Sequence, residues 1–263
     1  MDKISSNAAL LTTVATILAL ASTGGCQEKA PPASQGGTFS TELSTAAQKT
    51  EQYGAAEVTV KGQRGDNDPI TSTGTYSWID DIACDVTVNT AAARAQRLVK
   101  SSRMRLIVKD NAYYYQVNPR IKGKRWVRVE GTGVPSEQAA REAMVEADPT
   151  AALRAITNSH AVDDLGWETI RGTRAHHYRA KLDASRLGDD VENALGSALG
   201  GSSAIVDAWI SRKDLPVRTT QTVGTYKVTI DFLKFGATTT ITAPATSDTA
   251  TLADVAESGI RQP

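Results

Sequence analysis

Three histidines, His160, His176 and His177, are the side chains of this 263-residue chain best suited to proton transfer or metal binding. His176 and His177 are adjacent, and neighbouring side chains of a β-strand point to opposite faces of the sheet. The pair therefore cannot bind one metal ion from a single strand, and we expect at least one of the two to be an ordinary surface residue. We predict no metal site and no cofactor.

A serine that follows two glycines is the next candidate for chemistry. The run Gly200-Gly201-Ser202-Ser203-Ala204 approaches the nucleophile elbow of hydrolases, but those enzymes place their histidine after the serine, and no histidine follows Ser202. The two glycines are better interpreted as the end of a helix. The acidic pairs Asp80-Asp81, Asp163-Asp164 and Asp189-Asp190 are expected at turns and at a helix start. We therefore predict no catalytic residues and a protein that is not an enzyme.

The residues before Cys26 make this cysteine a candidate for lipidation. The run Ala8–Ala21 is apolar over 14 residues, which is shorter than the roughly 20 that span a bilayer and is typical of an export signal. It is followed by Ser22-Thr23-Gly24-Gly25-Cys26, which resembles the bacterial lipobox that ends in a lipidated cysteine, although Thr23 departs from the usual aliphatic residue. Ordinary signal cleavage after Ala21 is the alternative.

The charge balance narrows the range of partners. The chain has 29 basic and 29 acidic residues, without the basic excess that marks nucleic-acid binders, so we predict no nucleic-acid partner. One basic run could contact anionic lipid head groups or form a solvated edge; its members are Arg94, Arg97, Lys100, Arg103 and Arg105.

Composition divides the chain into four parts. Residues 1–25 are the predicted signal peptide, and residues 26–39 the lipidated cysteine and a disordered Pro-, Gly- and Ser-containing tether. Residues 40–246 form one predicted α+β domain. Residues 247–263 form a polar tail, with a short helix expected at 252–257, that we expect to fray.

Alternation of apolar and polar residues predicts two groups of antiparallel strands. Residues 58–129 form the first, with Asp110-Asn111 as a hairpin turn. Residues 166–244 form the second. Helices are expected at 40–53, 137–147, from Pro149 onward and at 189–199. Because the strands are grouped and do not alternate singly with helices, the pattern favours an antiparallel α+β domain.

Several short motifs, in this order, resemble the actinobacterial cell-envelope lipoproteins of the LppX, LprA, LprF and LprG group and, more remotely, the LolA and LolB carriers. They are Asp110-Asn111-Ala112-Tyr113-Tyr114, Lys124-Arg125-Trp126-Val127, Gly172 with His177-Tyr178, Asp207-Ala208-Trp209-Ile210, Leu215-Pro216-Val217-Arg218, and Phe235-Gly236 with Ile241-Thr242-Ala243-Pro244. The similarity covers roughly 40–244, and Ser211-Arg212-Lys213-Asp214 departs from it. The resemblance implies a curved antiparallel sheet, a half-barrel of two meanders, with helices covering its concave face around an apolar cavity for lipid chains.

Together with the lipobox-like run, the resemblance predicts a membrane-anchored envelope lipoprotein, attached through an N-terminal diacylglycerol-type anchor at Cys26 to the extracytoplasmic face of the cell membrane. It would bind or carry acyl lipids or glycolipids, with an unknown envelope protein as a further partner. The alternative is a structural or protein-interaction lipoprotein whose core is filled. The residues expected to line the cavity are Val58, Val60, Trp78, Ile82, Val86, Met104, Leu106, Tyr113, Tyr115, Tyr178, Leu195, Trp209, Tyr226 and Ile230.

Overall fold

The computed structural model of the chain describes residues 37–66, 69–79, 83–90, 99–130, 149–157, 159, 161–183, 203–236 and 240–258. Cys26 and the leader before it lie outside the described residues, as do the helices predicted at 137–147 and 189–199. Among the described residues, no helix has the length and apolar character needed to cross a membrane.

Six consecutive strands form the first meander, as the alternating pattern predicts. They are β1 (Ala55–Arg64), β2 (Ile70–Ser77), β3 (Ala83–Asn89), β4 (Arg103–Lys109), β5 (Ala112–Ile121) and β6 (Lys124–Glu130). Asp110 and Asn111 form the β4–β5 turn with φ angles of 51° and 56°. Asp and Asn tolerate this left-handed conformation, which a two-residue hairpin turn requires, so the turn predicted at these residues is confirmed.

Five strands form the second meander. They are β7 (Val162–Ile170), β8 (Thr173–Asp183), β9 (Ser203–Ser211), β10 (Pro216–Val223) and β11 (Tyr226–Phe235). The pair Asp163-Asp164, expected at a turn, lies inside β7. This strand is at the edge of the sheet, where both residues are exposed and charged side chains are tolerated.

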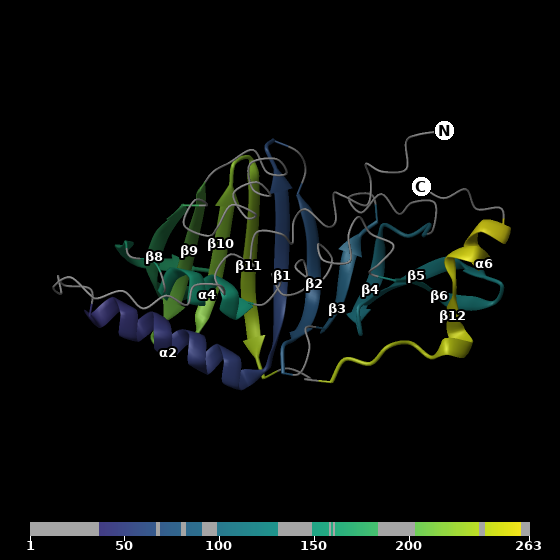
Figure 1. Ribbon diagram of the computed structural model, residues 1–263, viewed down its shortest axis with the longest axis horizontal. Helices are drawn as coiled ribbons and strands as arrows, with labels where there is room; N and C mark the ends of the chain where they lie inside the picture. Colours follow the sequence, from purple (N-terminus) through teal and green to yellow (C-terminus); the bar gives the residue numbers. More distant parts are fainter. Residues whose placement is uncertain are drawn as a thin grey trace.

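The two meanders join into one open sheet of twelve strands (Figure 1). Its order is β12-β6-β5-β4-β3-β2-β1-β11-β10-β9-β8-β7, where β12 (Thr249–Ala250) adds a short edge strand. β1 and β11 pair antiparallel and connect the meanders, while β12 is parallel to β6. The predicted fold class, a curved antiparallel α+β sheet built from two meanders, is confirmed.

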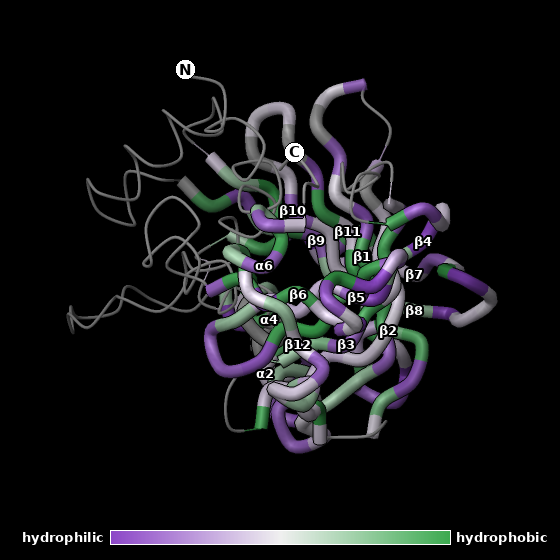
Figure 2. The backbone as a smooth tube through the Cα atoms, turned by 90° about the vertical axis from the view of Figure 1, so that its right-hand side faces the viewer, coloured by the Kyte–Doolittle hydropathy of each residue, from purple (hydrophilic) through white to green (hydrophobic). Residues whose placement is uncertain are grey.

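Two helices pack against each other and against one end of the sheet. α2 (Gly37–Tyr53) begins three residues before the helix predicted at 40–53, within the stretch expected to be a tether. α4 (Pro149–Thr157) begins at the predicted proline, and its Leu153 and Ile156 are fully buried. Figure 1 shows both helices in front of β8–β11, and Figure 2 shows hydrophobic stretches gathered toward the middle of the molecule.

The C-terminal segment is docked, and the prediction that it frays is wrong over the described residues. After the 3-10 turn η4 (Thr246–Asp248), β12 pairs with β6 and leads into α6 (Leu252–Glu257), the helix predicted at 252–257. Ala250 and Val255 are buried, and Thr251 and Asp254 form a capping box. The segment is held by the buried side chains of Ala250 and Val255 and by the capping box. The polar composition of the segment does not indicate these contacts.

Candidate functional site

The inner face, defined as the face of the sheet on which α2 and α4 pack, is apolar from β8 across to β5. Strand register shows its continuity, because cross-strand partners share a face. One row of successive partners runs through Tyr178, Ala208, Thr219, Ile230, Val60, Ser72, Val88 and Met104. A second row runs through Phe232, Val58, Gly74, Val86, Leu106 and Tyr115.

Most of the residues predicted to line a cavity lie together on this inner face. The structure places there Val58, Val60, Trp78, Val86, Met104, Leu106, Tyr113, Tyr115, Tyr178 and Ile230. Ile82 and Leu195 lie outside the described residues, and Tyr226 begins strand β11. The period-2 pattern therefore identified one continuous wall, because each of its strands pairs in register with the next.

Trp209 is the exception, because it lies on the opposite, outer face. Its ring stacks on His177 at 4.1 Å and packs with Ala175 and Val217, whereas its neighbours Ala208 and Ile210 face α2 and α4. β9 is buried on both faces, so alternation cannot distinguish inward from outward positions there. Ala208 faces inward, so its neighbour Trp209 must face outward. The prediction that Trp209 lines the cavity is therefore wrong, and Ile210 occupies the inward position.

Phenol and thiol groups on the inner face are held in their neutral forms. Burial raises the pKa of Tyr76 and of Tyr115 far above the ordinary value. Burial likewise raises the pKa of the Cys84 thiol to about 12, and Cys84 is the buried small residue that its parity predicts. A thiol that stays protonated at neutral pH is a poor nucleophile, so this wall offers contact surface and not reactivity.

The described helices cover only part of the inner face. Leu43 of α2 joins Leu153 and Ile156 of α4 over the β8–β9 end. The C-terminal part of α2 reaches further, because the Trp78 indole N–H donates to the Thr50 carbonyl over 3.1 Å. In Figure 1 no described helix lies in front of β3–β5.

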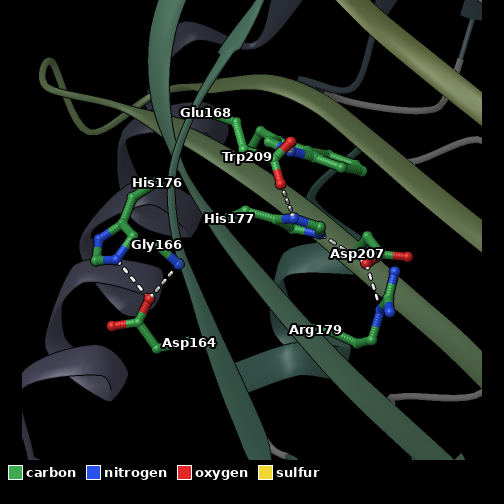
Figure 3. Close-up of polar contacts among 8 residues, drawn as sticks. All are labelled: Asp164, Gly166, Glu168, His176, His177, Arg179, Asp207 and Trp209. Carbon is green, nitrogen blue, oxygen red and sulfur yellow. Dashed lines mark hydrogen bonds and ion pairs between the residues drawn. The ribbon is translucent and has the colours of Figure 1, made fainter.

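A polar network lies on the outer face of β7–β9 (Figure 3). His177 Nδ1 lies 2.8 Å from Glu168 Oε1, and Nε2 lies 2.7 Å from Asp207 Oδ1. Arg179 Nε donates to the same Asp207 oxygen, and the Trp209 indole N–H donates to Glu168 Oε2. Hydrogen bonds from His177 and Trp209 lower the pKa of Glu168.

The two adjacent histidines point to opposite faces, as predicted, but neither described one is a surface residue. The side chains of His176 and His177 are 14% and 6% exposed. His176 Nε2 lies 2.6 Å from Asp164 Oδ1, and its Nδ1 lies 2.8 Å from the Tyr178 hydroxyl, which donates to Glu42. The carboxylates on neighbouring strands and on α2 make burial of both rings favourable.

These contacts leave both histidines without a free ring nitrogen for a substrate. Each nitrogen of His177 faces a carboxylate oxygen, so the network ties the edge strand β7 to β8 and β9. Within the part of the chain that the structure describes, no group of three or more His, Cys, Asp or Glu side chains could hold a metal ion.

Comparison with known proteins identifies the fold. No family model matches the chain. An uncharacterised 31.2 kDa protein of Streptomyces griseus, encoded between rplA and rplJ, is 24% identical over 82% of this chain and 80% of its own length.

Two solved structures are similar along their whole length. LprF of Mycobacterium bovis has a TM-score of 0.54 at 14% identity and aligns with 81% of this chain and all of its own. The lipoprotein LppX of Mycobacterium tuberculosis has a TM-score of 0.54 at 11% identity, over 79% of this chain and all of its own. The chain has the fold of these two mycobacterial proteins, as the sequence resemblance predicts.

Proposed function

We propose that this protein binds the acyl chains of a lipid against the inner face of its sheet. The observation that carries the proposal is the continuous, mainly apolar register from Tyr178 on β8 to Tyr115 on β5. An acyl chain laid against this wall would be shielded from water, and each methylene buried there contributes about 0.8 kcal/mol. The likeness to LppX and LprF supports the fold on which such a surface is carried.

Chain length gives the first test of this proposal. Two further methylenes contribute about 1.6 kcal/mol, so affinity for a series of saturated lipids should rise roughly tenfold with each pair until the wall is filled. Native mass spectrometry of gently purified protein should also detect a co-purifying acyl lipid. A protein that is empty on purification and binds no member of the series instead supports the alternative, a structural or interaction lipoprotein with a filled core.

A pair of neighbouring substitutions on β2 tests the position of the ligand. Ser72 lies on the inner face between Val60 and Val88, and its neighbour Thr71 pairs with exposed Lys61 on the outer face. Ser72→Trp places a bulky ring against the wall and should lower lipid affinity at least tenfold. Thr71→Trp should leave affinity unchanged. Equal effects of the two variants would argue against a ligand on this face.

We further propose that the protein is a lipoprotein anchored through Cys26 on the extracytoplasmic face of the cell membrane. The lipobox-like run that ends at Cys26 supports this assignment. Cys26→Ala should move the protein from the membrane fraction to the soluble fraction without changing its lipid affinity. Retention of the variant in the membrane fraction would exclude this anchor, whereas a wild-type protein that is already in the soluble fraction would favour cleavage after Ala21.

A further inference from the structure

Besides Ser72 on β2, the apolar wall is interrupted by polar side chains on strand β10. Gln221 is 4% exposed and lies in register between Val206 of β9 and Val228 of β11, which belong to the apolar clusters of the inner face. Thr219, two residues earlier on the same face, is 1% exposed. The middle of the wall therefore presents a buried amide and a hydroxyl where its neighbouring strands present aliphatic side chains.

The amide oxygen of Gln221 is buried and has no hydrogen-bond partner. A buried carbonyl oxygen without a donor loses its hydration without compensation, so such groups call for an explanation. Thr90 and Asn111 also have a buried unpartnered oxygen among the described residues, but Thr90 follows β3 and Asn111 lies in the β4–β5 turn. Gln221 alone of these lies in mid-strand, between two apolar clusters.

The charges around this amide limit what can approach it. The outward side chains of the same strands carry the ion pairs, because Arg218 binds Asp231 and Arg179 binds Asp207. The inward positions next to Gln221 on β9 and β11 are filled by uncharged residues, which are Ala204, Val206, Ala208, Val228 and Ile230. A charged head group at this place would be buried without a counter-ion, which is unfavourable.

From these observations we infer that the ligand carries an uncharged hydroxyl group that hydrogen-bonds to Gln221. The inference rests on the proposed function and specifies the lipid class as a hydroxylated neutral lipid, such as a glyceryl or glycosyl ester. A hydroxyl both donates and accepts, so it satisfies either terminal atom of the amide. A fatty-acid methyl ester has no donor, and a carboxylate brings an unpaired charge.

The test compares two ligands with the same 16-carbon acyl chain, monopalmitoylglycerol and methyl palmitate, by displacement of a fluorescent lipid from the full-length protein. The wild type should bind the glycerol ester on the order of tenfold more tightly. Gln221→Leu should bind both esters equally, at the wild-type affinity for methyl palmitate. Thr220→Val, on the same strand but the outer face, should retain the preference.

Each outcome separates this inference from the proposed function. Binding of both esters without preference by the wild type, or a preference that persists in Gln221→Leu, overturns the inference and leaves the acyl-binding proposal standing. Binding of neither ester removes both. If Gln221→Leu does not fold, the NMR signal of the Gln221 side-chain amide in the labelled wild-type protein provides the test. This signal should shift when monopalmitoylglycerol binds and should stay in place when methyl palmitate binds. The reverse result overturns the inference.

Discussion

Alkaline pH should unfold this protein abruptly, because three phenols are protonated in the folded state and not in the unfolded chain. Burial raises the pKa of Tyr76, Tyr115 and Tyr178 above the ordinary value of about 10. A group with a raised folded pKa stabilises the protein fully below its unfolded pKa, and this contribution is lost as pH rises above that value. Relative to neutral pH, each phenol then lowers the free energy of unfolding by about 1.4 kcal/mol at pH 11 and by about 2.7 kcal/mol at pH 12. The three together remove about 8 kcal/mol by pH 12, which is comparable to the whole stability of a typical domain.

The assay follows phenolate absorbance at 295 nm together with far-ultraviolet circular dichroism between pH 9 and pH 12.5. We expect a gradual absorbance rise from accessible tyrosines, then a cooperative step that coincides with loss of the strand signal between about pH 11 and pH 12. Tyr76→Phe should move this step to higher pH, whereas Tyr53→Phe, which removes a phenol that is 44% exposed, should not. Ionisation of all seven tyrosines near pH 10 with the strand signal intact would refute the burial of these phenols.

Three further substitutions test separate parts of the fold. A Cβ on Gly74 would lie 2.1 Å from the Asp85 carbonyl oxygen, so Gly74→Ala should separate β2 from β3 and lower the melting temperature by roughly 5–10 °C; a change under 2 °C would contradict this packing. Val255→Ala, in the docked C-terminal helix, should cost about 2 kcal/mol in urea unfolding, and a cost near zero would mean that the tail does not pack. Glu168→Gln should reduce the loss of melting temperature between pH 7 and pH 4, because a carboxylate whose pKa is lowered by His177 stabilises the fold only while it is ionised; identical pH profiles would contradict the network.

The sequence was sufficient to predict the two meanders and most of the inner wall. Val58, Val86 and Leu106 belong to strands in which apolar and polar residues alternate, and that alternation gives both the element and its buried face. The hairpin turn at Asp110-Asn111 was predictable because few residue pairs accept its conformation. These features depend on residues that are close together in the sequence, so each can be predicted from its own segment.

Features that depend on tertiary contacts could not be predicted in this way. The position of Trp209 depends on which strand pairs beside β9, because both faces of that strand are buried. The burial of His177 depends on Glu168 and Asp207, which lie 9 and 30 residues away in the sequence. Gln221 was not among the predicted wall residues, since the register that places it between Val206 and Val228 is not visible in β10 alone.

The two faces of the sheet have different roles: the outer face contributes to stability, and the inner face offers apolar contact surface. On the outer face, ion pairs and the stacked pair His177 and Trp209 join β7, β8 and β9, so that end is held from both sides once α2 and α4 pack on the inner face. The charged side chains of β9–β11 are therefore used for stability on the outer face, and the inner positions of these three strands are uncharged. The uncharged inner positions of β9–β11 suit acyl chains, and the unpartnered amide oxygen of Gln221 on these strands is then where a neutral head group would gain a specific contact.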